Sequence, residues 1–220
     1  MTPFPVLVTF ATGPKFCLRV AEMAGPWTVM LDSGAFSNWS SGKEKVTLPA
    51  YRDFLLEHGS RFRWCINLDV IGDAAASRRN LDALHAVGLR PVPVFQRGGS
   101  ADELRRMVQE HGPLVCIGGV SKTPNAHAEH DYMVQCLRIV RDAGGEAHLL
   151  GVSGAAQLRA LLPTAADSSS WNNAARYGNL HLWYGGKWWR YCKRSKQQAR
   201  RGVRPAPNRT RGLAAYGLTW

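Results

Sequence analysis

The sequence predicts an α/β protein, a compact (β/α)8 TIM-type barrel with a basic C-terminal extension. Eight short strand candidates recur along the chain, and segments of helical periodicity separate several of them. The strand candidates are nearly continuous apolar runs, as expected for a parallel sheet that is buried on both faces. The chain has 220 residues, which is short for this fold, so we expect a thin layer of helices.

The strand candidates are rich in β-branched and other apolar residues. They cover residues 6–10, 28–31, 63–69, 91–96, 114–118, 147–152, 165–168 and 180–184. The clearest helix candidates cover residues 48–58, 74–87, 101–111, 130–143 and 155–162. Gly88, Gly112 and Gly144 stand where helix C-caps are expected. An open doubly wound sheet is the alternative, but no G-x-G-x-x-G follows the first strand, which disfavours a dinucleotide-binding version.

Charge is concentrated near the C-terminus. The net charge is +12, and the segment from Lys187 to Arg211 contains ten Lys or Arg and no acid. Such a block favours a polyanionic partner, because neutralised phosphates release counterions. Trp188, Trp189 and Tyr191 interleave with the charges, whereas tails that only aid solubility avoid exposed aromatics. We therefore expect a barrel over residues 1–185 and a basic, aromatic helix and tail over residues 186–220.

The residues of this extension that we expect to contact nucleic acid are its cations. They are Lys187, Arg190, Lys193, Arg194, Lys196, Arg200 and Arg201. The alternative is a solvated tail without a binding role.

Targeting signals and metal motifs are not apparent in the sequence. No apolar run approaches the roughly 20 residues that cross a bilayer, and the N-terminus does not resemble a signal peptide. The five cysteines are an odd number and contain no zinc-type pair. We therefore expect a cytoplasmic protein with reduced thiols and no bound metal.

Candidate functional residues stand at the ends of the predicted strands, where barrels of this type carry their active sites. They are Asp32, Ser33, Gly34, Asp69, Gln96, Gly118, Gly119, Gly151 and Asp167. Asp32 also suits a tight turn, and Asp167 also suits a helix N-cap. Three carboxylates at separate strand ends nevertheless exceed what packing requires, because a buried carboxylate is costly unless it is paired or used.

The segment Leu31-Asp32-Ser33-Gly34-Ala35-Phe36-Ser37 resembles the Asp-Ser-Gly-Gly-Phe-Gln motif of the queuine and archaeosine tRNA-guanine transglycosylases. Further landmarks of that family have counterparts in the same order. They are Leu68-Asp69, Val94-Phe95-Gln96-Arg97-Gly98, Ile117-Gly118-Gly119-Val120-Ser121, Leu150-Gly151-Val152, and Asp167 where the family has its nucleophile. The resemblance covers about residues 28–171.

The chain departs from the tRNA enzymes in three ways. Ala35 and Ser37 replace the second Gly and the Gln of the first motif, and the chain is much shorter. The family's Cys-x-Cys-x-x-Cys and His zinc site has only Cys192 as a counterpart here. The resemblance is therefore greater to the DNA-modifying transglycosylases of phages and bacteria, the DpdA group, which insert a 7-deazaguanine of the preQ0 type into DNA.

The resemblance implies a role for each landmark. Asp167 would attack C1′ as guanine leaves, and Asp32 would exchange a proton with the departing and incoming bases. Asp69, Gln96 and the Gly119 N–H would recognise the base, and Phe36, Val120 or Trp171 could stack on it, although each could equally be a core residue. Ser33, Gly34, Gly118 and Gly151 would complete the substrate site. No cofactor is implied, and the expected partners are DNA, which presents a flipped or unpaired base, and a free 7-deazaguanine base.

Three alternatives remain open at this point. The same chemistry could act on tRNA. A base-releasing glycosylase would let water resolve the intermediate and would need no incoming base. A non-catalytic nucleic-acid-binding barrel would bind through the tail and would not depend on Asp167.

Overall fold

The computed structural model describes residues 5–25, 28–42, 46–119, 126–169, 179–184 and 187–192. The chain divides into two compact units, Met1–Asp167 and Ser168–Trp220. The expected division lay after residue 185, within the second unit.

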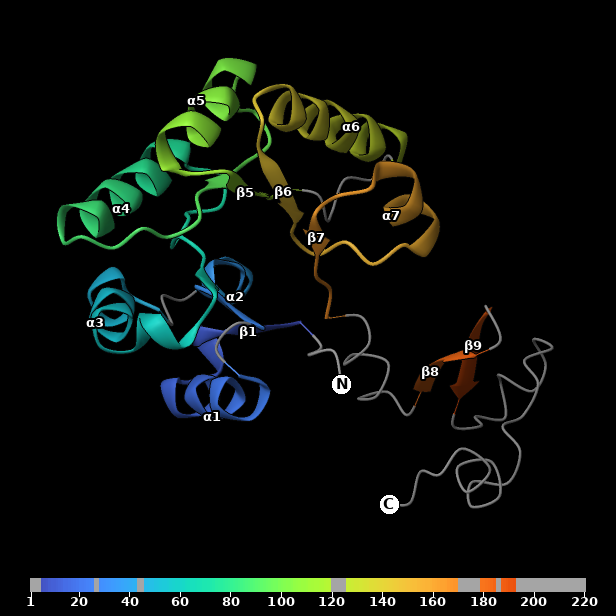
Figure 1. Ribbon diagram of the computed structural model, residues 1–220, viewed down its shortest axis with the longest axis horizontal. Coiled ribbons are helices and arrows are strands. Elements are labelled where there is room, and N and C mark those ends of the chain that lie inside the picture. Colours follow the sequence, from blue (N-terminus) through green and yellow to red (C-terminus); the bar gives the residue numbers. More distant parts are fainter. Residues whose placement is uncertain are drawn as a thin grey trace. The chain divides into compact units, whose positions relative to one another are not determined.

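Seven short parallel strands form the frame of the first unit (Figure 1). They are β1 (Val6–Thr9), β2 (Val29–Asp32), β3 (Trp64–Cys65), β4 (Val94–Phe95), β5 (Leu114–Ile117), β6 (Glu146–Leu149) and β7 (Ala165–Ala166). β1, β2 and β3 pair in one parallel sheet, and β4, β5, β6 and β7 pair in another. An isolated bridge between Ile66, after β3, and Val92, before β4, links the two sheets. The predicted α/β class with parallel strands is thus confirmed.

Helices alternate with these strands along the chain (Figure 1). They are α1 (Pro14–Ala24), α2 (Ala35–Ser41), α3 (Leu48–His58), α4 (Ala74–Ala86), α5 (Ala101–His111), α6 (Ala126–Asp142) and α7 (Ala155–Leu161), with two 3-10 turns, η1 (Phe10–Thr12) and η2 (Gly59–Arg61). Side-chain oxygens of Thr47, Asp73 and Ser100 cap α3, α4 and α5 by accepting hydrogen bonds from backbone N–H groups. The helices α1 and α2 were not predicted.

Alternate residues of the strands belong to different hydrophobic clusters. In β5, Val115 and Ile117 pack with α5 and α6 residues, whereas Leu114 and Cys116 join a cluster made by the strands themselves. In β2, Leu31 packs with residues of α1 and α3, and Met30 joins the strand cluster. Successive side chains of a strand point to opposite faces, so the sheet has an outer face covered by helices and an inner face packed on itself.

The ends of β2 and β7, which carry Asp32 and Asp167, belong to the two different sheets, and the charge of Asp167 raises the pKa of the Asp32 carboxyl. Among the described residues β7 and β1 are not paired with each other, so a complete (β/α)8 barrel is not seen.

The second unit differs from the prediction. Residues 180–184 were expected to be the eighth barrel strand and residues from 186 onward a helix. Instead β8 (Asn179–Tyr184) and β9 (Lys187–Cys192) form an antiparallel hairpin. Its two intervening residues are Gly185 and Gly186, and a Gly-Gly pair between β-prone runs is a strong hairpin signal that the sequence analysis overlooked.

No helix in the part of the chain that the structure describes has the length and apolar character needed to cross a membrane.

Candidate active site

The inner face ends in a polar layer at the carboxyl ends of the strands. Met30 and Asp32 are two residues apart on β2 and therefore share the inner face, as do Cys116 and Gly118 along β5. On β7 Ala166 packs on the outer side, so the alternation directs the next residue, Asp167, inward. Asp69 lies in the loop after β3, where Gln96 holds its carboxyl.

Asp32 occupies a tight strand-to-helix turn. Its Oδ2 accepts a hydrogen bond of 3.1 Å from the Gly34 N–H. Gly34 has a φ of 95°, and a Cβ there would lie 2.8 Å from the Cβ of Ala11, so only glycine fits this close approach. The backbone of the Asp-Ser-Gly segment therefore holds the carboxylate at the strand end.

The environment of Asp32 disfavours its charged form. Burial raises the pKa of its carboxyl, and the charge of Asp167 raises it further. Thr9 of β1 pairs in register with Asp32, and its hydroxyl lowers the pKa of the carboxyl. The geometry between the Thr9 hydroxyl and the described residues is nevertheless not that of a standard hydrogen bond. A carboxyl of this kind can hold a proton and deliver it.

Asp69 and Gln96 form one unit. The Gln96 amide donates from Nε2 to Asp69 Oδ2 over 2.6 Å and accepts at Oε1 from the Gly72 N–H over 2.8 Å. Burial, followed by the charge of Asp32, raises the pKa of Asp69 to about 7. The backbone of the loop after β3 thereby fixes Gln96, and Gln96 fixes the carboxyl.

Asp167 is held through one oxygen. Its Oδ1 lies 3.0 Å from His148 Nε2 and accepts a 3.2 Å hydrogen bond from the Gly151 N–H. The Asp167 side chain retains 23% exposure, whereas that of His148 retains 4%. The carboxylate thus faces the open end of the sheet while its histidine partner lies buried behind it.

The thiol of Cys116 is affected by the charges of all three aspartates. Burial raises its pKa well above the ordinary value, and the charges of Asp32, Asp69 and Asp167 each add to that shift. Cys116 is fully buried at the inner end of β5. All three carboxylates therefore act electrostatically on the same buried thiol of β5.

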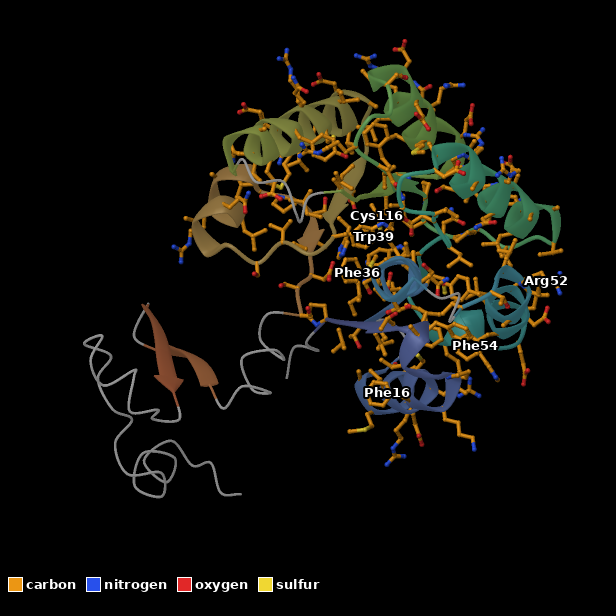
Figure 2. All side chains as sticks on the ribbon, turned by 180° about the vertical axis from the view of Figure 1, so that it is seen from behind. Phe16, Phe36, Trp39, Arg52, Phe54 and Cys116 are labelled. Carbon is orange, nitrogen blue, oxygen red and sulfur yellow. The ribbon has the colours of Figure 1, made fainter. Side chains whose placement is uncertain are left out.

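Two cavities adjoin Asp69 and Gln96. The larger one, of ≈ 440 Å³, lies beside Asp69 and is bounded mainly by α2 and by the loop after β3. Of its lining residues in the described part of the chain, Asp69 is the single ionisable one, and Trp39 contributes a half-exposed ring. Figure 2 shows Trp39 with Phe36 on α2, and their ring centroids are 5.7 Å apart. The volume and aromatic lining suit a planar small molecule.

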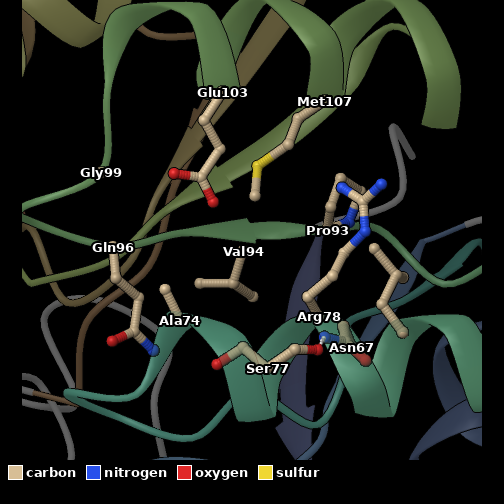
Figure 3. Close-up of a pocket in the computed structure, with 11 residues that line it drawn as sticks. Asn67, Ala74, Ser77, Arg78, Pro93, Val94, Gln96, Gly99, Glu103 and Met107 are labelled. Atoms are coloured by element: carbon tan, nitrogen blue, oxygen red, sulfur yellow. Dashed lines mark hydrogen bonds between the residues drawn. The ribbon is translucent and has the colours of Figure 1, made fainter.

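The smaller cavity lies between α4 and α5 next to Gln96 (Figure 3). Its volume of ≈ 20 Å³ admits about one water molecule, so it is too small for a substrate.

The remaining predicted substrate residues occupy different environments. Ser33 is fully buried, and Phe36 is half-exposed. The Gly118 carbonyl accepts from the Tyr132 hydroxyl, and Gly119, with a φ of 69°, packs against the backbone of Arg97. Sequence reasoning missed His148 and Trp39. His148 is a polar residue between two apolar ones in a strand, and Trp39 follows Phe36 by one helical turn, which were the available signals.

The predicted nucleic-acid contacts fall in the second unit. Lys187 and Arg190 belong to β9. Lys193, Arg194, Lys196, Arg200 and Arg201 lie outside the described residues. No group of three or more His, Cys, Asp or Glu side chains among the described residues is arranged to hold a metal ion.

Comparisons with known proteins add little. No family model and no curated protein matches the chain. It is similar to the structure of the PaMucR phosphodiesterase in complex with c-di-GMP, at 19% identity over 68% of this chain and 67% of that chain, with a TM-score of 0.41. It is also similar to protein SMc04130 from Sinorhizobium meliloti 1021, at 12% identity over 79% of this chain and 69% of that chain, with a TM-score of 0.26. These TM-scores are too low to carry an argument about fold or function.

Proposed function

We propose that this protein is a nucleic-acid guanine transglycosylase, a pentosyltransferase that exchanges guanine in DNA for a 7-deazaguanine base through a covalent aspartyl-glycosyl intermediate. Its proposed frame is a TIM-type barrel, of which the described residues supply seven parallel strands. The observation that carries the proposal is that three aspartates at or just after strand ends are each held by a hydrogen bond, Asp32 by the Gly34 N–H, Asp69 by Gln96 and Asp167 by the Gly151 N–H. Three carboxylates in different environments provide a nucleophile, a proton carrier and a base-binding group.

The first half-reaction begins at Asp167. Its carboxylate attacks C1′ of the target nucleotide, the bond from C1′ to guanine breaks, and the electron pair leaves with the base. Asp32, whose raised pKa favours a bound proton, protonates the departing guanine. In the second half-reaction Asp32 removes a proton from the incoming 7-deazaguanine, whose nitrogen attacks C1′ and releases Asp167.

Recognition of the base involves Asp69 and the cavity beside it. Guanine and 7-deazaguanines carry N–H donors at N1 and N2, which a carboxylate accepts. The cavity has room for a base, and Asp69 is the ionisable group in its described lining. A base without these donors would give the Asp69 carboxylate no partner beyond Gln96, so adenine is rejected.

Mass spectrometry of nucleosides tests the proposal. Cells that express the protein and receive a 7-deazaguanine supply are expected to contain the corresponding deoxynucleoside in their DNA. The same nucleoside in tRNA alone would identify the tRNA-directed alternative, and abasic sites without any exchange would identify a base-releasing glycosylase. Absence of all three products, with the purified protein supplied with DNA, tRNA and the base, would refute the proposed function.

We propose that the basic extension provides most of the affinity for nucleic acid. A chain that ends at Arg194 keeps both strands of the hairpin and lacks six of the ten cations in the Lys187–Arg211 segment. We expect it to bind duplex DNA far more weakly. The slope of log K against log salt should become shallower by up to about 5, because each neutralised phosphate contributes about 0.9.

Fluorescence anisotropy with labelled DNA at several salt concentrations measures both quantities. The control is the full-length chain with the same six cations changed to Gln, which should behave as the truncated chain does. An unchanged affinity and slope would show that the extension is a solvated appendage and that binding depends on Arg97, Lys122 and Arg176 at the expected barrel mouth.

A further inference from the structure

His148 differs from the other residues of its strand. It stands on β6 between Ala147 and Leu149, which both pack into the cluster formed with the outer helices. Its own side chain therefore points to the inner face, where it pairs in register with Cys116 of β5 and Ala165 of β7. His148 is only 4% exposed, and a buried imidazole is unfavourable unless its nitrogen atoms form hydrogen bonds.

One of those atoms is used and the other is not. Nε2 lies 3.0 Å from Asp167 Oδ1, whereas Nδ1 is buried and has no hydrogen-bond partner among the described residues. A proton on Nδ1 would be a buried, unpaired donor, which is costly. The arrangement therefore favours a hydrogen on Nε2, donated to the carboxylate of Asp167.

Both hydrogen bonds to Asp167 from described residues fall on the same oxygen. His148 Nε2 and the Gly151 N–H both lie on Oδ1, and Oδ2 receives neither of them. Two donors from different positions on and after β6 fix the plane of the carboxylate as well as its place. The other oxygen is then presented in a constant direction.

We propose that His148 is a positioning residue, which donates its Nε2–H to Asp167 Oδ1 and so presents Oδ2 as the reacting oxygen. The reaction itself rests on the proposed transglycosylase function, whereas the tautomer and the orientation of Asp167 do not. The titratable groups that face His148 are Asp167 on its own edge of the sheet, Asp32 across the inner face and Cys116 on β5.

The first test requires no substrate. In protein labelled with 15N-histidine, long-range proton–nitrogen spectra identify the tautomer of each ring, and the signals that disappear in His148→Gln belong to His148. We expect the Nε2–H tautomer, and we expect its Nε2 signal to shift in Asp167→Asn. A hydrogen on Nδ1 would overturn the proposal, and so would a chemical shift of His148 Nε2 that stays the same in Asp167→Asn.

The second test uses base exchange. His148→Gln retains an N–H donor that can reach Oδ1, and we expect activity within about tenfold of the original. His148→Leu fills the space without a donor, and kcat should fall roughly a hundredfold with KM for the base unchanged, since misplacement of a reacting group by about 1 Å has this effect.

His111 offers a matched control, because its Nε2 is also buried without a hydrogen bond to a described residue, but it lies on α5 beside Glu110, at 3.6 Å from Oε2, rather than beside one of the three site aspartates. His111→Leu should exchange bases normally. If His148→Leu folds and retains the original kcat, the positioning role is wrong. If the unchanged protein exchanges no base on any nucleic acid, the proposed function fails, and the spectra alone then decide on His148.

Discussion

Replacement of Asp167 by Asn is expected to abolish base exchange while the protein keeps its fold and its affinity for DNA. The Asn side-chain oxygen can still accept from His148 Nε2 and from the Gly151 N–H, so the local structure should survive. An amide oxygen does not form the glycosyl ester that exchange requires. We expect a loss of at least about 10⁴-fold, the scale seen when a covalent nucleophile is removed.

Release of labelled guanine from DNA measures this loss, and a denaturing gel reveals the covalent intermediate. The adduct should form with the unchanged protein, map to the peptide that contains Asp167, and be missing from the variant. Asp53→Asn is the matched control, because Asp53 is an exposed aspartate on α3 whose ion pair with Arg52 contributes little. Normal turnover by Asp167→Asn would rule out its role as nucleophile.

Replacement of Asp32 or Asp69 by Asn is expected to reduce exchange without loss of stability. Asp32→Asn removes the proton carrier and should lower kcat by about 10²–10⁴-fold. Asp69→Asn replaces a carboxylate acceptor of the base by an amide and should raise KM for the incoming base by about 10–100-fold, the value of a hydrogen bond to a charged group.

At alkaline pH, Asp69→Asn should be more stable than the original protein. The folded protein holds a proton on Asp69 up to a pKa of about 7, compared with 3.8 for the ordinary side chain. Between these values the folded state binds more protons than the unfolded state, so the original protein loses stability as pH rises through this window. The variant has no carboxyl at this position and does not lose stability in this window. Above pH 7 its free energy of unfolding should exceed that of the original protein by on the order of 2 kcal/mol, which is less than the full pKa difference implies because Asp69 is partly exposed.

Urea unfolding at pH 5 and pH 8 compares the two proteins. A variant that is less stable than the original at both values would indicate that Asp69 supports the fold rather than the site.

The strands and the site could be predicted to different extents. Alternation of apolar runs with helical periods was enough for the parallel α/β frame, and the rule that strand ends carry active sites led to Asp32, Asp69 and Asp167. The helix α2 was missed because Ser and Asn dominate it, and these residues are poor helix formers that prefer caps and turns. Its formation depends on the turn at Gly34 and on burial of Ala35.

His148 escaped prediction for a different reason. It lies within a strand rather than at its end, and its importance depends on which face of the sheet it occupies. Periodicity gives the two faces of a strand but does not say which one faces the helices. That distinction came from tertiary packing. The pairing of β8 with β9, in contrast, was signalled locally by Gly185 and Gly186 and was overlooked.

The inward position of His148 depends on the pairing register of β6. A slip of one residue in the pairing of β6 would turn His148 toward the helices and bring Ala147 or Leu149 to the inner face. Such a species would keep the same helices and strands, so circular dichroism would hardly distinguish it from the native protein. The ring signal of His148, which reports its contact with Asp167, is therefore a more direct measure of correct pairing than the content of secondary structure.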